Sequence, residues 1–343
     1  MKKIFMTGAT GYLGTVLLEL LFKEGYQITV LCLPDEDVSY VAEYAKVILG
    51  DIRDEKLVDI IVDYDFCIHL AGLIDISSRN SKLMFDINVN GTANIANLCH
   101  KNKIKLIYSS SVHAIPPLKK QQSMSEITDF DPKKVKGLYS KTKALATKSV
   151  IELRNMGLEA MICFPSGIIG PKERRLTNIG QLIADYLTNQ LKAYVKGSYN
   201  FVDVRDVAEG ILLMLKNFQS GDDYLLTGHK VSVKEMLEII STTSQQPMLK
   251  LRLPFWFVYA TGYFSELYYY IRSKKPLYTR YSLMTLRTNC NFNYQKAKDK
   301  LGFLPRSSKV SLEEMTKWVL DHFIERDNNK FKIVLFKKGA NDN

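Results

Sequence analysis

The chain has 343 residues, enough for two ordinary domains or for one large α/β domain with a cap. Hydrophobic residues make up 46% and charged residues 24%, which excludes a disordered, collagen-like or disulfide-stapled protein. The five cysteines lie far apart and form no Cys-x-x-Cys pair. A metal site is therefore not expected, and a reducing, cytoplasmic compartment fits best.

The net charge of +11 is concentrated near the C-terminus. Residues 1–246 hold 29 Lys and Arg against 28 Asp and Glu, whereas residues 247–343 hold 18 against 8. Such a surplus suits an acidic substrate, an anionic membrane surface or a solvated basic face. No nucleic-acid-binding motif accompanies it, so nucleic acid is not an expected partner.

No apolar stretch is long enough to span a bilayer. The nearest candidate is the aromatic segment at 253–275, which contains Glu266 and ends among basic residues. This composition indicates either peripheral contact with an anionic membrane or a helix that caps a substrate pocket.

Short β-rich runs alternate with longer helical patterns through the first half of the chain, which predicts a parallel sheet with helices on both faces. The predicted strands are Lys3–Thr7, Ile28–Leu33, Lys46–Leu49, Phe66–Leu70, Leu106–Ser109 and Ala160–Phe164. The predicted helices among them are Tyr12–Lys23, Lys82–Lys101 and Leu138–Asn155. Later segments include a short strand, Tyr224–Leu226, and the helices Leu176–Asn189, Val231–Thr242 and Ser311–Glu325.

The expected fold class is α/β, a Rossmann-type doubly wound parallel sheet with a smaller, mainly helical C-terminal substrate domain. Residues 1–165 plus about 199–229 are predicted to form the dinucleotide-binding domain. Residues at about 166–198 and 230–327 are predicted to form the substrate-binding cap, and 328–343 a basic tail.

A glycine-rich turn follows the first predicted strand and opens the first helix. Such turns bind a dinucleotide, because one glycine permits the tight turn, the next lets the backbone approach a pyrophosphate, and the third lets the helix pack closely on the strand. The amides at the start of the helix lie at its positive end. The predicted cofactor-binding residues of this turn are Thr7, Gly8, Gly11, Tyr12, Leu13 and Gly14.

The sequence Tyr139-Ser140-Lys141-Thr142-Lys143 places a tyrosine and a lysine four residues apart, on one face of a helix. A tyrosine with a pKa of about 10 is poorly suited to proton transfer at neutral pH. A neighbouring ammonium lowers that value. Tyr139 is therefore predicted to exchange a proton with an alcohol or alkoxide, assisted by Lys143.

The order of these motifs, from residue 4 to about residue 320, resembles the extended branch of the short-chain dehydrogenase/reductase superfamily. Further matches are Gly50-Asp51-Ile52-Arg53-Asp54, His69-Leu70-Ala71-Gly72, Asn88-Val89-Asn90-Gly91-Thr92, Phe201–Ala208 and Leu301–Pro305. The resemblance implies that Lys143 also holds the nicotinamide ribose and that the cofactor contacts Asp51, Ile52, Leu70, Ala71, Gly72, Asn88, Ser109, Tyr139, Pro165, Gly167 and Ile168.

The resemblance also implies a catalytic serine at the end of the strand that reads Tyr108-Ser109-Ser110-Ser111. The third hydroxyl matches the family position, so Ser111 is the candidate and Ser110 the alternative. A hydroxyl there would stabilise charge on the substrate oxygen. His113 and Tyr199 are the candidate substrate contacts, and many relatives are homodimers through helices corresponding to Lys82–Lys101 and Leu138–Asn155.

One departure from the family pattern bears on the cofactor. Cys32 and Leu33 stand where relatives have an acid for the ribose hydroxyls or an arginine for a 2′-phosphate. Asp35 lies just beyond and favours NAD, and no arginine is near in sequence. The prediction is therefore NAD or NADP, with NAD preferred.

The C-terminal third resembles the 3β-hydroxysteroid dehydrogenase and dihydroflavonol reductase-like group. The predicted function is an NAD(P)-dependent dehydrogenase or reductase acting on the CH–OH or carbonyl carbon of a hydrophobic, steroid- or flavonoid-like substrate. The alternatives are a sugar-nucleotide epimerase and a non-catalytic regulator that senses dinucleotide. Relatives of the last kind usually lose the tyrosine–lysine pair, which this chain retains.

Overall fold

A computed structural model describes residues 1–74, 80–119, 121–262, 280–327 and 330–337. The chain forms two compact units. Unit 1 comprises Met1–Ser166, Arg205–Thr227 and Asn291–Leu304, and unit 2 comprises Gly167–Val204, Gly228–Cys290 and Pro305–Asn343. Among the described residues, no helix is long and apolar enough to cross a membrane.

Unit 1 is built on a seven-stranded sheet with the order β10-β6-β5-β4-β1-β2-β3, in which all neighbouring strands run parallel. The strands are β1 (Lys3–Thr7), β2 (Gln27–Cys32), β3 (Lys46–Leu49), β4 (Phe66–His69), β5 (Lys105–Ser109), β6 (Ala160–Pro165) and β10 (Tyr224–Leu226). This sheet confirms the predicted Rossmann-type fold. Its strand order reverses between β1 and β4, and ligands of such sheets bind beyond the carboxyl ends of the strands at that point.

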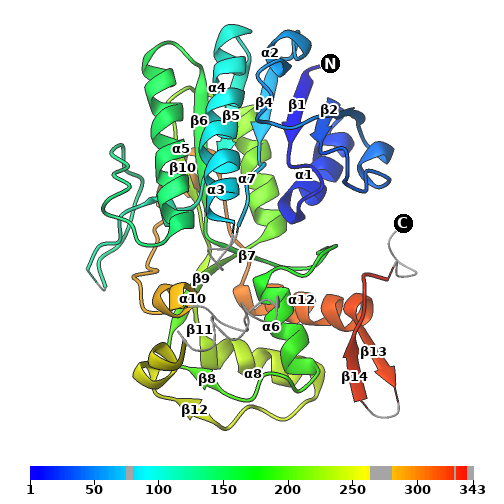
Figure 1. The fold of residues 1–343 in the computed structure, drawn as a ribbon, viewed down its shortest axis with the longest axis vertical. Helices are drawn as coiled ribbons and strands as arrows, with labels where there is room; N and C mark the ends of the chain where they lie inside the picture. Colours follow the sequence, from blue (N-terminus) through cyan, green and yellow to red (C-terminus); the bar gives the residue numbers. More distant parts are fainter. Residues whose placement is uncertain (75–79, 120, 263–279, 328–329, 338–343) are drawn as a thin grey trace. The chain divides into compact units, whose positions relative to one another are not determined.

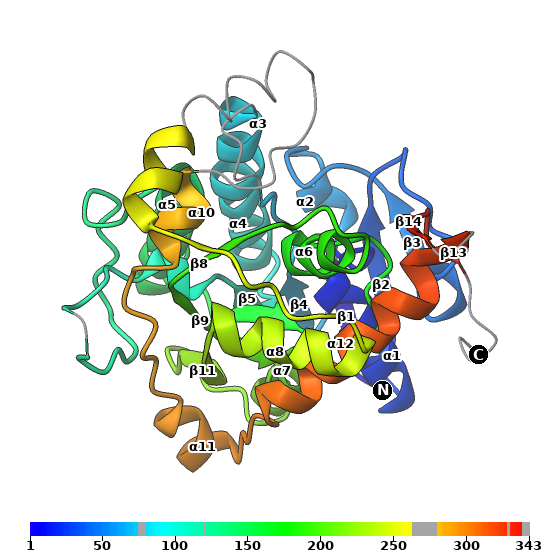
Figure 2. The same cartoon turned by 90° about the horizontal axis from the view of Figure 1, so that it is seen from below.

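Helices cover both faces of this sheet (Figures 1 and 2). α1 (Tyr12–Lys23) and α7 (Val204–Lys216) lie on one face, and α4 (Thr92–Lys101) and α5 (Leu138–Asn155) lie on the other. The strands between them have few exposed positions, and all six residues of β6 are buried. Burial from both sides explains why the strand sequences are continuously apolar rather than alternating. Shorter helical segments of unit 1 are η1 (Val41–Glu43), α2 (Leu57–Ile60), η3 (Val112–Ala114) and α11 (Gln295–Leu301).

The helix predicted over Lys82–Lys101 is one continuous helical segment in which a π-helical turn separates two α-helices. α3 (Ser81–Phe85) leads into a π-helical turn, Asp86–Gly91, and then into α4. A π turn inserts an extra residue into a helix and is frequently found at functional sites. This one carries Asn88, a predicted site residue.

Unit 2 contains a three-stranded sheet with the order β11-β9-β7 and three longer helices. The strands are β7 (Gly167–Ile169), β9 (Ser198–Asp203) and β11 (His229–Ser232), and the helices are α6 (Asn178–Leu187), α8 (Val233–Ser244) and α12 (Ser308–Phe323). Apolar side chains from all three helices, including Ile183, Met236 and Met315, share one core. The remaining elements are β8 (Tyr194–Val195), β12 (Arg252–Leu253), a helical segment at 255–262 and α10 (Arg280–Thr285).

The chain after α12 forms a hairpin of β13 (Ile324–Asp327) and β14 (Lys330–Ile333). Beyond it, the Val334 amide donates to the Phe323 carbonyl at 2.8 Å, which returns the chain to the end of α12. The segment predicted as a basic tail from residue 328 is thus paired and packed in part, and residues 338–343 lie outside the described residues.

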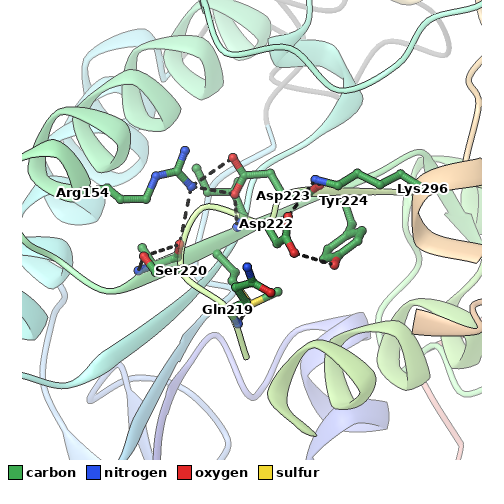
Figure 3. Close-up of polar contacts among 10 residues, drawn as sticks. Arg154, Gln219, Ser220, Asp222, Asp223, Tyr224 and Lys296 are labelled. Atoms are coloured by element: carbon green, nitrogen blue, oxygen red, sulfur yellow. Dashed lines mark hydrogen bonds and ion pairs between the residues drawn. The ribbon is translucent and has the colours of Figure 1, made fainter. Parts of the chain in front are cut away.

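A charged cluster fixes the outer strand β10 (Figure 3). Arg154, near the end of α5, lies 2.8 Å from an Asp223 carboxylate oxygen that also accepts a hydrogen bond from the Ile162 amide of β6. Lys296 of α11 donates to the Asp223 carbonyl at 3.0 Å. One aspartate therefore joins α5, β6, β10 and α11. Its side chain is only 9% exposed, and that of Arg154 only 15%.

Replacing Asp223 with alanine is expected to lower the free energy of unfolding by about 3–5 kcal/mol, because the Arg154 guanidinium would remain buried without its carboxylate. The control is Asp59→Ala, which breaks an exposed ion pair with Lys101 and is expected to cost less than about 1 kcal/mol. Urea denaturation of both variants gives the comparison. Equal stability of the two variants would show that the Asp223 cluster does not hold this edge of the sheet.

Candidate active site

The glycine turn after β1 has the geometry of a phosphate cradle. Gly8 has a φ of +75°, and a Cβ atom there would lie 2.6 Å from the Ala71 nitrogen. A Cβ on Gly14 would lie 2.0 Å from the Gly8 carbonyl oxygen, so glycine is required at both positions. α1 begins after Gly11 without a side-chain cap. Its positive end is therefore presented where a diphosphate would bind.

Two acids follow the end of β2, Asp35, which is predicted to favour NAD, and Glu36. Asp35 is exposed, whereas the Glu36 carboxylate accepts a hydrogen bond from the Leu33 amide at 3.2 Å. Burial, followed by the nearby charge of Glu36, raises the pKa of the Cys32 thiol to about 11. Glu36 thus places its charge beside the position where relatives carry the ribose-binding acid. The available signal was its spacing, since an acid three residues after Leu33 can turn back to accept a hydrogen bond from the amide of that residue.

Asp51, predicted to contact adenine, follows β3 and is paired with Arg53. Its carboxylate accepts from the Arg53 backbone amide and Nε, both at 2.9 Å, and from Nη2 at 2.6 Å. Hydrogen bonding to Arg53 lowers the pKa of Asp51 below its usual value, although burial opposes this. Ile52 is buried against Gly91, where an added Cβ would lie 2.6 Å from the isoleucine Cδ1. Asp51 is therefore ionised and held at the end of β3.

Asn88 holds the turn that follows β4. Its side-chain oxygen accepts from the Leu73 amide at 2.7 Å, and its amide nitrogen donates to the Leu73 carbonyl at 2.9 Å and to Thr142 of α5 at 3.2 Å. The residue is only 1% exposed. The Asn88 side chain is thus bonded to the protein, and it holds the turn that contains Leu70, Ala71 and Gly72 through Leu73.

The tyrosine–lysine pair lies near the start of α5, and both side chains are buried. The Lys143 ammonium donates to the Ser109 carbonyl at 3.0 Å and to the Tyr108 hydroxyl at 3.4 Å. Burial lowers the pKa of Lys143 to about 8. Cys163 on β6 is a neutral neighbour, because burial raises the pKa of its thiol to about 12. Lys143 is therefore a charged group at neutral pH with few charges around it.

Ser111 and His113 complete this part of the site. The Ser111 hydroxyl accepts a hydrogen bond from the His113 amide at 3.2 Å, which leaves its own hydrogen for another acceptor. The His113 ring meets Tyr139 edge-on, with centroids 5.9 Å apart. Ser110 is engaged elsewhere, 2.6 Å from the Thr147 hydroxyl.

The remaining predicted residues fall in two places. Pro165 ends β6 in unit 1, whereas Gly167 and Ile168 begin β7 and Tyr199 lies on β9 in unit 2. Within unit 2, the Tyr199 ring lies 5.4 Å from that of Phe201. The residues of unit 1 come together at the carboxyl edge of its sheet.

The sequence profile of the NAD dependent epimerase/dehydratase family matches residues 4–227, which is most of the chain. The chain belongs to this family. Membership confirms the resemblance to extended short-chain dehydrogenases/reductases and the prediction of an enzyme in this NAD-dependent class.

Curated relatives of this family member cover nearly its whole length. A putative dihydroflavonol 4-reductase from Synechocystis is 27% identical, covering 93% of this chain and 94% of the relative. Sterol demethylase protein B from Methylococcus capsulatus is 24% identical over 91% and 97% of the two chains. A decarboxylating sterol-4-alpha-carboxylate 3-dehydrogenase from Dictyostelium discoideum is 21% identical over 88% and 96%.

Solved structures agree with this assignment. The crystal structure of gox2253 has a TM-score of 0.81 and 28% identity, covering 93% of this chain and 98% of the other. The epimerase/dehydratase family member described here therefore shares its fold over almost the entire chain.

Proposed function

We propose that this protein is an NAD-preferring dehydrogenase or reductase that interconverts an alcohol and a carbonyl on a hydrophobic substrate. The observation that carries the proposal is the arrangement of Tyr139, Lys143 and Ser111 at the carboxyl edge of the sheet, with Lys143 buried and charged. When bound, the dinucleotide supplies or accepts the hydride. The residues of the chain itself bind the substrate oxygen and move its proton.

Each of the three side chains has a separate role. Ser111 donates its hydroxyl hydrogen to the substrate oxygen and stabilises negative charge there. Tyr139 gives a proton to that oxygen in reduction and takes one from it in oxidation. Lys143 favours the phenolate through its positive charge. Two of its three N–H groups bind Ser109 and Tyr108, and the third suits a ribose hydroxyl.

The cofactor-binding residues fit a dinucleotide. Gly8 permits the tight turn and Gly14 the close packing of α1, so that the start of the helix is placed where it can receive a diphosphate. At the end of β2, the negative charge of Glu36 would repel a 2′-phosphate and accept hydrogen bonds from ribose hydroxyls. Arg53, the cation near this end of the sheet, is paired with Asp51. These features favour NAD over NADP.

The substrate class rests on the relatives. Their names point to flavonoid and sterol substrates, which are flat and largely apolar. A sugar-nucleotide epimerase is the second candidate, and it would convert substrate without net change in the cofactor.

The Tyr139→Phe variant is expected to lose turnover by about 10²–10⁴-fold, because it lacks the exchangeable proton. NADH oxidation is measured with a panel of steroid, flavonoid and sugar-nucleotide carbonyls, and NADH binding is measured by fluorescence as the control for folding. Binding should be unchanged. Unchanged turnover in this variant would show that Tyr139 is not the proton donor. NADH binding by the wild type without oxidation by any carbonyl of the panel would instead favour the dinucleotide-sensing regulator.

The Glu36→Gln variant is expected to lower the ratio of the Kd for NADPH to the Kd for NADH by about tenfold, since it removes a charge that repels the 2′-phosphate. Asp35→Asn is the matched control and should leave the ratio close to that of the wild type. A change of this ratio in Asp35→Asn but not in Glu36→Gln would show that Asp35 discriminates between NADH and NADPH, as the sequence predicted.

We also propose that the segment 253–275 contacts anionic membrane, a surface described here as far as residue 262. Trp256 is 71% exposed and Phe257 is 44% exposed, and the basic residues Lys250 and Arg252 precede them. Exposed aromatic rings beside basic side chains suit the headgroup region of an anionic bilayer. The homodimer predicted from family resemblance stays a prediction.

Sedimentation with phosphatidylserine-containing vesicles is expected to carry down the wild type, and the double variant Trp256→Ser/Phe257→Ser much less. Met156→Ser, which removes an exposed apolar side chain in unit 1, is the control and should sediment like the wild type. Binding should fall as salt is added. Equal sedimentation of the double variant and the wild type would assign these aromatic residues to another role.

A further inference from the structure

A row of buried polar side chains crosses the centre of the unit 1 sheet. Thr7 of β1 pairs in register with His69 of β4, and His69 pairs in register with Tyr108 of β5. Partners in register on parallel strands project to the same face. Thr7 Oγ1 lies 2.7 Å from His69 Nδ1, and the rings of His69 and Tyr108 stack with centroids 5.5 Å apart. All three residues are fully buried.

Thr92 of α4 extends the row on the other side of His69. Its hydroxyl lies 3.0 Å from His69 Nε2, so both ring nitrogens of His69 are bonded and its ring is fixed against Tyr108. Burial, and then the charge of Lys143, lower the pKa of His69 to about 3. Burial raises the pKa of Tyr108 far above its usual value. Both groups therefore stay neutral at physiological pH, and Tyr108 keeps its hydroxyl hydrogen.

Hydrogen bonds around Lys143 tie its helix to the end of β5. Thr147 donates its hydroxyl hydrogen to the Lys143 carbonyl at 2.8 Å, so in its 2.6 Å contact with Ser110 it must accept. Ser110 is thereby engaged with α5. The Tyr108 oxygen accepts from the Lys143 ammonium at 3.4 Å, and the Ser109 carbonyl accepts from it at 3.0 Å.

The two bonds of the ammonium restrict a side chain that otherwise has four rotatable bonds. The ammonium is also 5.0 Å from the centre of the Tyr108 ring, so the tyrosine presents both its hydroxyl and its aromatic face. A Cβ on Gly72 would lie 3.4 Å from the Lys143 nitrogen, and glycine there leaves space beside the ammonium. A buried cation is costly unless acceptors compensate the lost water, and the Tyr108 hydroxyl is one of two such acceptors with Ser109.

We propose that Tyr108 is a positioning residue of the reaction, whose hydroxyl and aromatic face fix the Lys143 ammonium and support its charged state. The inference rests on the proposed function, because it assigns a role to Tyr108 through Lys143. The stacking of the Tyr108 ring on His69 holds the tyrosine in place for this role.

The first test needs no substrate. In protein labelled with 13C at the lysine ε-carbon, the Lys143 resonance is expected to titrate near pH 8, and Lys143→Arg assigns it by its loss. Tyr108→Phe removes an acceptor that favours the charged form, so the titration midpoint should fall by about one pH unit. Tyr224→Phe is the matched control, because Tyr224 is also buried and has a lysine, Lys296, over its ring at 4.9 Å. The titration midpoint of Lys143 in Tyr224→Phe should equal that in the wild type.

The second test is the pH profile of alcohol oxidation. The rate requires charged Lys143, so it declines as pH rises through the pKa of that residue. In Tyr108→Phe this alkaline decline should move to lower pH and kcat should fall about tenfold, while KM for the alcohol stays within about twofold. A purely structural role would reduce the amount of active enzyme without moving the profile. If Tyr108→Phe fails to fold, 3-fluorotyrosine is placed at position 108, because its hydroxyl is a weaker acceptor, and it should move the decline in the same direction.

The outcomes separate this inference from the proposed function. A Lys143 midpoint and pH profile in Tyr108→Phe that match those of Tyr224→Phe would overturn the role of Tyr108 alone. Full turnover by Tyr139→Phe would overturn the proposed function, whereas the shift in the Lys143 titration would still establish the contact between Tyr108 and Lys143.

Discussion

The buried ammonium of Lys143 constrains how α5 packs against the sheet of unit 1. Lys143 is 5% exposed, and burial lowers its pKa to about 8, so a small further loss of acceptors would neutralise it near physiological pH. Its two acceptors, the Ser109 carbonyl and the Tyr108 hydroxyl, are both supplied by the end of β5. The charge of Lys143 therefore depends on the position of α5 relative to β5. Packing of α5 against the sheet holds that position, so the core supports the protonation state that the reaction needs.

Local patterns in the sequence predicted the elements that depend on local physics. The strands of the parallel sheet were predicted because burial on both faces requires continuous apolar runs. The glycine turn was predicted because only glycine tolerates the backbone of Gly8 and the contact at Gly14. The pair Tyr139 and Lys143 was predicted because a helix brings residues four apart onto one face.

The remaining features depend on contacts between distant segments. Tyr108 reads as an ordinary core residue of a strand, and its polar role arises from its register with His69 and from the helices above it. The π turn at Asp86–Gly91 accompanies side-chain bonds from Asn88 to Leu73 and Thr142, which helical periodicity does not encode. Glu36 rather than Asp35 closes the end of β2 because the chain turns back there. These features follow from tertiary geometry rather than from composition.

Several polar side chains of unit 1 are bonded to one another, although the buried hydroxyls of Ser166 and Thr227 have no hydrogen-bond partner in the part of the chain that the structure describes. This bears on the proposed substrate. Asn88 is bonded to Leu73, Ser110 to Thr147 and Lys143 to the end of β5, all within the described residues. Ser111 retains a hydrogen that it can donate to a substrate oxygen. A polyhydroxylated sugar needs several matched donors and acceptors, since unpaired polar groups are costly once buried. A flat apolar molecule with one oxygen at the reacting carbon needs far fewer, and this supports the proposal of a hydrophobic substrate over that of a sugar nucleotide.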